Sequence, residues 1–202
     1  IPARHAILGP LIRSIFVPEK NCEWGIFDYS QQEPRLVVHY ASLQEFTGAS
    51  KFLDAYEEED TTDFHQLVAD IANIPRKQAK TINLGLFYGM GKGKLMSQLG
   101  LNQEDAEDLL ADYHDRVPFV RQLMKDTMYK AGKKGFLRTL RGRKCRFDMW
   151  EPKTFGVHKA LPLKEAANEY GDQMIKRAWT YKALNRLIQG SAADQTKQAM
   201  LN

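Results

Sequence analysis

Two cations, a leucine and a tyrosine recur at four-residue intervals near the middle of the chain: Arg76, Lys80, Leu84 and Tyr88. In a helix such positions form one slowly winding stripe, with about 40° between neighbours. Arginine binds phosphate oxygens with a bidentate fork and lysine with a mobile charge, and both stand near the positive end of the helix dipole. The leucine and tyrosine suit a sugar and a base, so the stripe is ordered like a nucleoside triphosphate. An amphipathic helix with two surface cations explains the same spacing, and Phe87 lies on the side of the cations.

A carboxylate is the second candidate for chemistry. Asp28 comes near the end of the apolar and aromatic run 24–29, which predicts a buried strand. A carboxylate leaving such a strand is a natural ligand for magnesium. Phosphoryl transfer with two metal ions needs more than one carboxylate, so Asp28 requires a partner. The alternative role of Asp28 is a polar cap at the end of the strand.

The elements that position these residues are predicted to be mostly helical. Asn102 is a plausible N-cap, Pro118 closes the segment that follows it, and apolar residues recur at helical spacing after Leu163. The predicted helices cover 33–41, 76–90, 103–117 and 163–187. Strands are expected at 24–29 and around 136–140.

Composition limits the class of protein. The chain has 202 residues, 43% of them hydrophobic and 27% charged, which suits one or two globular domains. It has no apolar run long enough for a transmembrane helix and no signal-peptide pattern at its start. Its two cysteines exclude a disulfide framework and a cysteine-rich zinc site. Both ends are interpreted as cuts in a longer protein.

Positive charge is concentrated in one stretch. The formal net charge is +4, and residues 121–146 hold ten basic residues with Asp126 as the one acid. Such a stretch is typical of a surface that faces phosphates, although a solvated helix face has the same composition. Nucleic acid is therefore a candidate partner.

Several segments resemble family A (bacterial polymerase I-like) DNA polymerases. Residues 28–35 are similar to the family's D-Y-S-Q-x-E-x-R segment, and residues 76–89 to its R-x3-K-x6-7-Y-G helix. Smaller matches fall in the same order at 1–4, 63–65, 139–143 and 189–194, so the resemblance covers essentially the whole chain. Only 11 positions separate His65 from Arg76, which resembles the bacteriophage branch.

The resemblance implies an α+β, mostly helical fold: a partial palm sheet plus the helical fingers of a right-hand polymerase. Residues 1–44 would be a palm part with the first catalytic aspartate, 45–184 the fingers and 185–202 a return to the palm. The implied function is DNA replication, by deoxynucleotidyl transfer to a primer 3′-hydroxyl with two Mg²⁺ ions. The implied partners are primer–template DNA and deoxynucleoside triphosphates, with no membrane. The expected location is intracellular, in a bacterial host if the gene is a phage gene, and a processivity factor stays open.

Site residues follow from the same resemblance. Asp28 and Lys80 would be catalytic, with Asp28 and the Tyr29 carbonyl at the metal. Glu33 would be a steric gate against a ribose 2′-hydroxyl, with Tyr88 closing the other side. The nucleotide-binding set would be Gln31, Glu33, His65, Arg76, Lys80, Leu84 and Tyr88. The DNA-binding set would be Arg4, Tyr88, Asn185 and Gln189.

The chain also departs from the family. Leu84 stands where phenylalanine or tyrosine is usual, and Pro34 replaces a common aliphatic residue without an evident functional reason. The family's second aspartate lies in a His-Asp-Glu segment, whereas the His114-Asp115 pair belongs to a predicted acidic helix and is rejected for that role. With one catalytic carboxylate, this chain alone is expected to be inactive.

Two other functions remain open. A single-subunit RNA polymerase would share the fold and an R-x3-K-type helix, but it has no use for a gate such as Glu33. A non-catalytic DNA-binding module is the other alternative.

Overall fold

The computed structural model describes residues 5–88, 92–154, 156–157 and 159–202. Contacts divide the chain into two units, Ile1–Ser30 and Gln31–Asn202. The described part of the first unit holds one helix, α1 (Leu8–Ser14), followed by irregular chain.

The strand predicted at 24–29 is not formed. The segment has no regular secondary structure, and the side chains of Ile26 and Phe27 are 92% and 95% exposed. A strand needs a neighbouring strand to satisfy its backbone N–H and C=O groups. Within the described part of the first unit no second strand is available, so apolar composition alone does not produce one.

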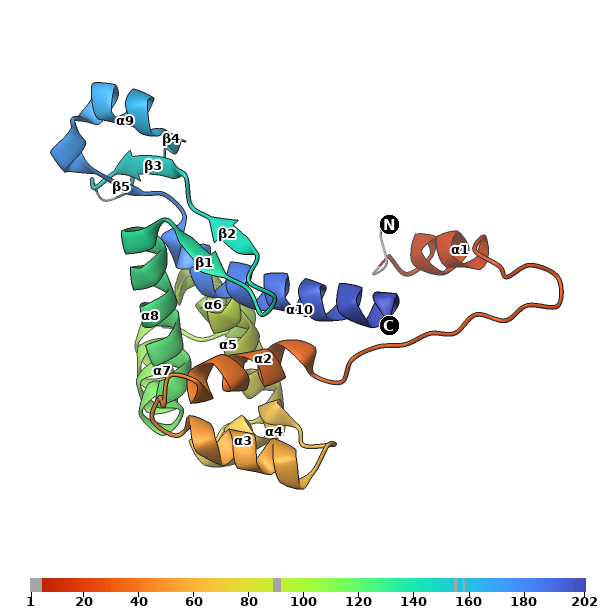
Figure 1. Cartoon of the computed structure of the whole chain (residues 1–202). Coiled ribbons are helices and arrows are strands. Elements are labelled where there is room, and N and C mark those ends of the chain that lie inside the picture. The colour runs from red at the N-terminus through yellow and green to blue at the C-terminus, as the bar shows by residue number, and fades with distance from the viewer. Residues whose placement is uncertain (1–4, 89–91, 155, 158) are drawn as a thin grey trace. The chain divides into compact units, whose positions relative to one another are not determined.

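The second unit is built mainly from helices, drawn in Figure 1. Several of them pack around one hydrophobic core, in which the rings of Phe52, Phe64, Phe87 and Phe119 meet with centroids 5.0–6.4 Å apart. Offset and edge-on aromatic pairs of this kind add to the stabilisation from burial. The helices are α2 (Gln32–Ser42), α3 (Ala49–Glu58), α4 (Phe64–Ala72), α5 (Arg76–Phe87), α6 (Lys92–Leu99), α7 (Gln103–Arg116), α8 (Pro118–Lys134), α9 (Leu163–Tyr170) and α10 (Ala183–Leu201).

Local signals set several helix ends as predicted. The Asn102 side chain accepts a hydrogen bond of 2.9 Å from the Asp105 N–H at the start of α7. Pro118 ends that segment and opens α8, where its missing N–H costs nothing. The predicted helix at 33–41 is confirmed as α2. The one predicted at 76–90 is confirmed as far as Phe87, and residues 89–91 lie outside the described part.

The single helix predicted over 163–187 is wrong. The chain leaves α9 at Gly171, whose φ of 83° suits glycine, and passes through short 3₁₀ turns at Asp172–Met174 and Thr180–Lys182. Between these turns it forms strand β5 (Ile175–Arg177), which pairs with β3. Apolar residues keep helical spacing across the break, so the pattern could not reveal it.

Two small antiparallel sheets complete the unit. β1 (Phe136–Arg138), which confirms the strand expected near 136–140, pairs with β2 (Lys144–Arg146). β3 (Met149–Pro152) lies between β4 (Leu161–Pro162) and β5, and α9 contacts all three of these strands (Figure 1). The mostly helical α+β fold is thus confirmed.

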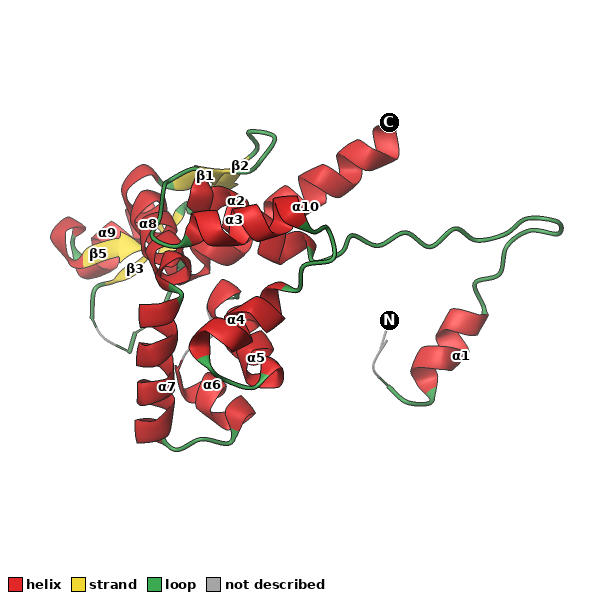
Figure 2. Cartoon of the chain, turned by 90° about the horizontal axis from the view of Figure 1, so that it is seen from below, coloured by secondary structure: helices red, strands yellow, loops and turns green. Residues whose placement is uncertain are grey.

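The predicted division into palm and fingers stays a prediction. Helix α2, which the sequence assigns to a palm part ending at residue 44, contacts α3, α8 and α10 and belongs to the second unit. Figure 2 shows α4, α5 and α6 as neighbours in that unit, and α4·α5 and α5·α6 are contacting pairs. None of the described helices is long and apolar enough to cross a membrane.

Candidate functional site

Helix α5 presents the predicted stripe on its accessible side. Arg76 and Lys80 are exposed, Leu84 is half-buried, and Tyr88, the residue that follows the helix, is 38% exposed. The opposite side is buried, and it includes Phe87, which packs in the core rather than beside the cations. The two cations therefore form an accessible pair in the first turn and a half of the helix.

The first cation is held by a carboxylate. Asp63 caps α4, accepting hydrogen bonds of 2.9 Å and 3.1 Å from the His65 and Gln66 N–H groups with Oδ1. Its Oδ2 accepts a hydrogen bond of 2.9 Å from Arg76 Nε and forms an ion pair with Arg76 Nη2. Partial burial raises the pKa of Asp63, but the Arg76 guanidinium and the cap hydrogen bonds outweigh it and leave this pKa below its usual value. One side chain thus fastens the start of α5 to the start of α4.

His65 lies beside the two cations. It is 8% exposed, and burial lowers its pKa, the charge of Asp63 opposes that shift, and Lys80 and Arg76 lower the pKa further. An imidazole with a lowered pKa is neutral near pH 7 and donates one N–H. The fold has brought together three of the predicted nucleotide-binding residues.

A second group forms at the far end of α5. The Tyr88 hydroxyl donates a hydrogen bond of 2.7 Å to Glu33 Oε2, and it also bonds the side chain of Gln189. Burial and the Glu33 carboxylate raise the pKa of Tyr88, so its phenol stays protonated and remains a donor. This contact joins the start of α2, the end of α5 and α10, which lie far apart in sequence. Asn185, half-buried, precedes Gln189 by four residues and shares its face of α10.

Gln31 is engaged by the protein. Its Nε2 donates to the Thr62 carbonyl at 2.6 Å, and its Oε1 accepts from the Phe64 N–H at 2.7 Å. Arg35, one turn later, places its guanidinium 4.3 Å from the centre of the Tyr56 ring. These contacts tie the start of α2 to the segment that carries His65, so both amide atoms of Gln31 serve to position the site.

The predicted metal ligands belong to a different unit of the chain from the residues described above. Asp28 and Tyr29 belong to the first unit, and Arg4 lies outside the described residues. Within residues 5–88, 92–154, 156–157 and 159–202, no three or more His, Cys, Asp or Glu side chains form a group that could hold a metal ion.

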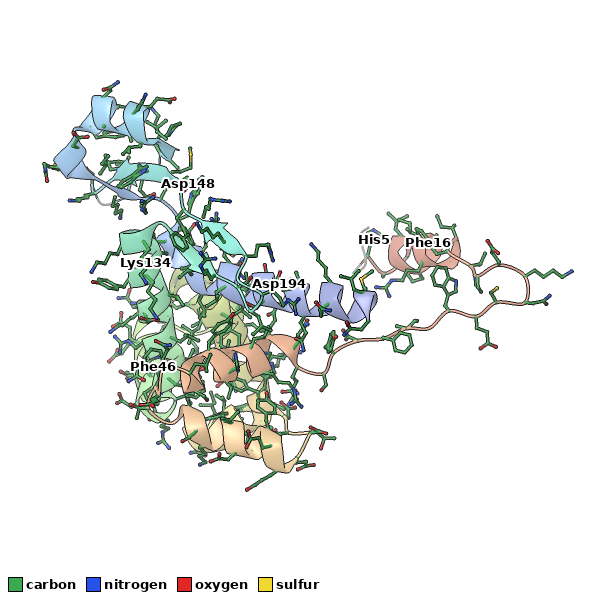
Figure 3. The ribbon with its side chains drawn as sticks, in the orientation of Figure 1. His5, Phe16, Phe46, Lys134, Asp148 and Asp194 are labelled. Carbon is green, nitrogen blue, oxygen red and sulfur yellow. The ribbon has the colours of Figure 1, made fainter. Side chains whose placement is uncertain are left out.

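Other contacts escaped the sequence reasoning. Asp194 on α10, labelled in Figure 3, accepts hydrogen bonds from Thr139 and, at 2.9 Å, from Arg143, at the turn between β1 and β2. Burial raises the pKa of Asp194, and the hydrogen bonds of Thr139 and Arg143 outweigh it and lower this pKa. The signal available was that 139–143 and 189–194 both matched the family. Asn83, a fully buried polar residue of α5, was also missed.

Comparisons with known proteins identify the family to which the chain is similar. The sequence model of DNA polymerase family A matches residues 1–202. A DNA-directed DNA polymerase of Pseudomonas phage M6 is 36% identical, over 99% of this chain and 33% of its own length. DNA polymerase I of Pseudomonas aeruginosa is 32% identical, over 100% of this chain and 20% of its own. The chain thus spans a third or less of the length of these relatives.

A solved structure is similar as well. It is described as the POL domain of Pol1 from M. smegmatis in complex with DNA primer-template and dNTP, and it has a TM-score of 0.63 and 30% sequence identity. The match covers 87% of this chain and 28% of that one. Together with the family match over all 202 residues, this similarity shows that the chain belongs to DNA polymerase family A.

Proposed function

We propose that this chain carries the deoxynucleotide-binding part of a template-directed DNA polymerase that functions in DNA replication. The observation that carries the proposal is the grouping of His65, Arg76 and Lys80 at one end of α5 and of Glu33 and Tyr88 at the other. The two groups match the parts of a deoxynucleoside triphosphate in order. The phosphates of the nucleotide would contact the cations, and its sugar would lie near the Glu33–Tyr88 pair. Family membership supports it.

The group formed by His65, Arg76 and Lys80 is suited to bind an anion. Lys80 forms no ion pair within the described part of the chain, so its ammonium is available to an anion. Arg76 is already oriented by Asp63, and its guanidinium has further N–H donors for phosphate oxygens. His65 adds a neutral N–H donor. In the proposed reaction these groups hold the triphosphate while the primer 3′-oxygen forms a bond to the α-phosphorus, the hydroxyl proton is lost, and the bond to the leaving pyrophosphate breaks. Lys80 faces the charge that develops there.

The Glu33–Tyr88 pair is suited to exclude a ribose 2′-hydroxyl. The Tyr88–Glu33 hydrogen bond fixes the carboxylate where a ribose 2′-hydroxyl would crowd it. Leu84, half-buried between the two ends, offers an apolar contact to the sugar. Gln31 contributes by holding the start of α2 against the His65 segment.

The DNA partner is proposed to be a primer–template duplex. Gln189 contacts Tyr88, and Asn185 lies on the same face of α10 as Gln189. Both side chains would accept or donate hydrogen bonds at the minor-groove edges common to all correct base pairs. Arg4 is proposed to join them, and Tyr88 to stack at the templating position when the fingers open. The Pol1 structure that this chain resembles contains primer-template and dNTP.

Family A DNA polymerases are generally metal-dependent, and magnesium is the proposed cofactor, with two ions. Asp28 and the Tyr29 carbonyl are the proposed ligands on this chain, and a site for two ions needs another carboxylate beside Asp28. Because the described residues form no such group, we assign no reaction step to a metal.

Glu33 separates this proposal from an RNA polymerase. Its carboxylate is fixed beside Tyr88, which serves an enzyme that rejects ribonucleotides. Comparing deoxynucleotide with ribonucleotide incorporation by the complete gene product decides between the two. A pure DNA-binding module, in turn, has no use for the His65, Arg76 and Lys80 group.

Lys80→Ala tests the proposed phosphate contact. Removing a charged donor to phosphate costs about 1.5–3 kcal/mol, or roughly tenfold to hundredfold in dNTP use. The measurement is the dNTP concentration dependence of primer extension by the complete gene product. Lys51→Ala is the control, because Lys51 is also an exposed helical lysine, on α3, and belongs to none of the proposed binding groups. Undiminished extension by Lys80→Ala contradicts the assignment.

A further inference from the structure

The ring of His65 makes a buried contact that its phosphate-binding role does not use. Its Nδ1 lies 3.0 Å from Nδ2 of Asn83, whose side chain is fully buried on α5. A buried amide is a costly choice for a core position unless all its polar atoms are satisfied. An amide at this core position, where an aliphatic side chain would also fit, therefore indicates a specific role for Asn83.

The other end of the same amide is also occupied. The hydroxyl of Tyr113, a fully buried residue of α7, donates a hydrogen bond of 2.5 Å to Asn83 Oδ1. Burial raises the pKa of Tyr113, so the hydroxyl keeps its proton. Three side chains from α4, α5 and α7 thus form one continuous chain of hydrogen bonds, in the order Tyr113, Asn83, His65.

The direction of these bonds sets the position of the imidazole proton. With Oδ1 facing Tyr113, the amide presents its NH₂ group to His65, and an amide nitrogen donates but does not accept. The Nδ1 atom of His65 must then be the acceptor, which leaves the ring proton on Nε2. A doubly protonated ring would bring two N–H groups face to face at the Asn83 contact.

We propose that Asn83 and Tyr113 are positioning residues that hold His65 as a neutral donor through Nε2 at the triphosphate site. The inference rests on the proposed function, since it presumes that His65 contacts phosphate. It adds two residues outside the predicted nucleotide-binding set and gives them a shared task.

The charged surroundings favour the same state. Arg76 and Lys80 on α5 disfavour an imidazolium, Asp63 at the start of α4 favours one, and burial decides for the neutral ring, with a lowered pKa. Within the described residues, the charged groups that shift the pKa of His65 are Asp63, Lys80 and Arg76. His65 thereby adds a hydrogen bond to phosphate without a third positive charge that its two neighbours would repel.

NMR of the full 202-residue chain tests the relay, that is, the hydrogen-bonded chain from Tyr113 through Asn83 to His65. Long-range ¹H–¹⁵N spectra, with the His65 signals assigned from His65→Gln, should show the neutral Nε2–H tautomer at pH 7. Asn83→Asp replaces the NH₂ donor by an acceptor, so it should move a proton to Nδ1 and raise the pKa of His65 by more than about one unit. Tyr113→Phe keeps the packing, frees the amide to turn, and should mix the two tautomers.

The control is Tyr40→Phe. It also removes one tyrosine hydroxyl from a partly buried hydrogen bond, the 2.7 Å contact with Ser191. Among the described residues, the side-chain and ring contacts of His65 are with Asn83 and Phe64. Tyr40→Phe should leave the His65 spectrum unchanged. A His65 spectrum that is the same in the native chain, Asn83→Asp and Tyr113→Phe overturns the relay.

Binding of dATP separates the relay from the proposed function. Tyr113→Phe should weaken dATP binding about threefold to tenfold, the value of roughly one hydrogen bond, while Tyr40→Phe should stay within about twofold. If the tautomer responds as expected but His65→Gln binds dATP as well as the native chain, the relay is supported and the phosphate role of His65 is refuted. If His65→Gln weakens binding but the tautomer never responds, the relay is overturned and the nucleotide site stands.

Discussion

Arg76 is held by a protein carboxylate before any nucleotide is present. Asp63 satisfies two N–H groups of α4 with one oxygen and the Arg76 guanidinium with the other. Such an arrangement would limit the side-chain entropy that Arg76 loses in the proposed binding of phosphate, because the guanidinium is already fixed in place. The residue that supports the cation is itself an anion, so its charge also tempers the attraction for phosphate.

Asp63→Asn tests how much the ion pair with Arg76 stabilises the fold. Asparagine caps a helix as well as aspartate, so the free energy of unfolding at pH 7 should change by less than about 1 kcal/mol, the value of a surface ion pair. The pKa of Asp63 is lowered on folding, so its ionic contribution is present above the unfolded pKa of about 4 and is lost as pH falls through the folded value. Urea unfolding of both proteins from pH 7 to pH 2 should show the stability difference shrinking at the acid end. A difference that stays constant contradicts this account.

Leu84 stands at the position where the resemblance to family A predicts phenylalanine or tyrosine. A dideoxynucleotide lacks the 3′-hydroxyl, and a tyrosine hydroxyl at this position can replace the hydrogen bond that is missing, whereas leucine has no donor. Leu84→Tyr should therefore raise dideoxynucleotide incorporation, relative to deoxynucleotide, by about tenfold, the value of roughly 1.4 kcal/mol. Competition primer extension by the complete gene product measures the ratio. Leu84→Phe, a ring without a hydroxyl, should stay close to leucine, and equal ratios for Leu84→Tyr and the native enzyme refute the hypothesis.

At the scale of elements, α5 carries most of the candidate site. Its accessible side holds Arg76, Lys80 and Leu84, and its buried side holds Asn83 and packs against α4. Helix α10 contributes Gln189, which contacts Tyr88. Where α10 begins depends on how the chain turns after α9. The break at Gly171 therefore matters for a residue 18 positions further along, because a continuous helix from 163 would place Gln189 elsewhere.

Gly171→Ala tests the break between α9 and α10. The glycine has φ 83° and ψ 144°, a region that L-residues avoid, so alanine should destabilise the second unit by about 1–3 kcal/mol. Gly132→Ala is the matched control: Gly132 is exposed in the last part of α8, a Cβ there meets nothing within 4 Å, and alanine should stabilise that helix by up to about 1 kcal/mol. Thermal unfolding of the three proteins measures both effects. Equal destabilisation by the two substitutions contradicts the interpretation of Gly171.

At the scale of the whole molecule, the two units differ in how much regular secondary structure and buried apolar surface they have. The unit Gln31–Asn202 has a continuous apolar core, whereas the described part of the first unit exposes large apolar side chains such as Phe16, Trp24 and Phe27. Residues 16–29 form no helix or strand. Irregular, exposed chain is where proteases cut first.

Limited proteolysis should therefore begin within residues 16–30. Trypsin has a site at Lys20, and chymotrypsin has sites at Trp24 and Phe27. Mass spectrometry should show a persistent product that starts in this range, and circular dichroism should show that the product keeps the helical signal of the second unit. First cleavage inside α2–α8 would instead mean that the apolar core of that unit does not protect it.

Sequence alone determined the family and the mostly helical fold, and it named the candidate site residues. It could do so because helix caps, four-residue spacing and motif order are local properties, readable from neighbours along the chain. Asn102, Pro118 and the stripe from Arg76 to Tyr88 are examples, and the structure forms all of them as expected.

Only the tertiary structure decided which of these residues meet. The strand expected at 24–29 failed because its pairing partner is not a local property, and the helix expected over 163–187 broke because β5 pairs with β3 across intervening chain. Likewise, no spacing rule showed that Asp63 holds Arg76, that Tyr88 reaches Glu33, or that Tyr113 and Asn83 stand behind His65. These contacts join residues 13 to 55 positions apart, and only packing of the helices brings such side chains within hydrogen-bonding distance.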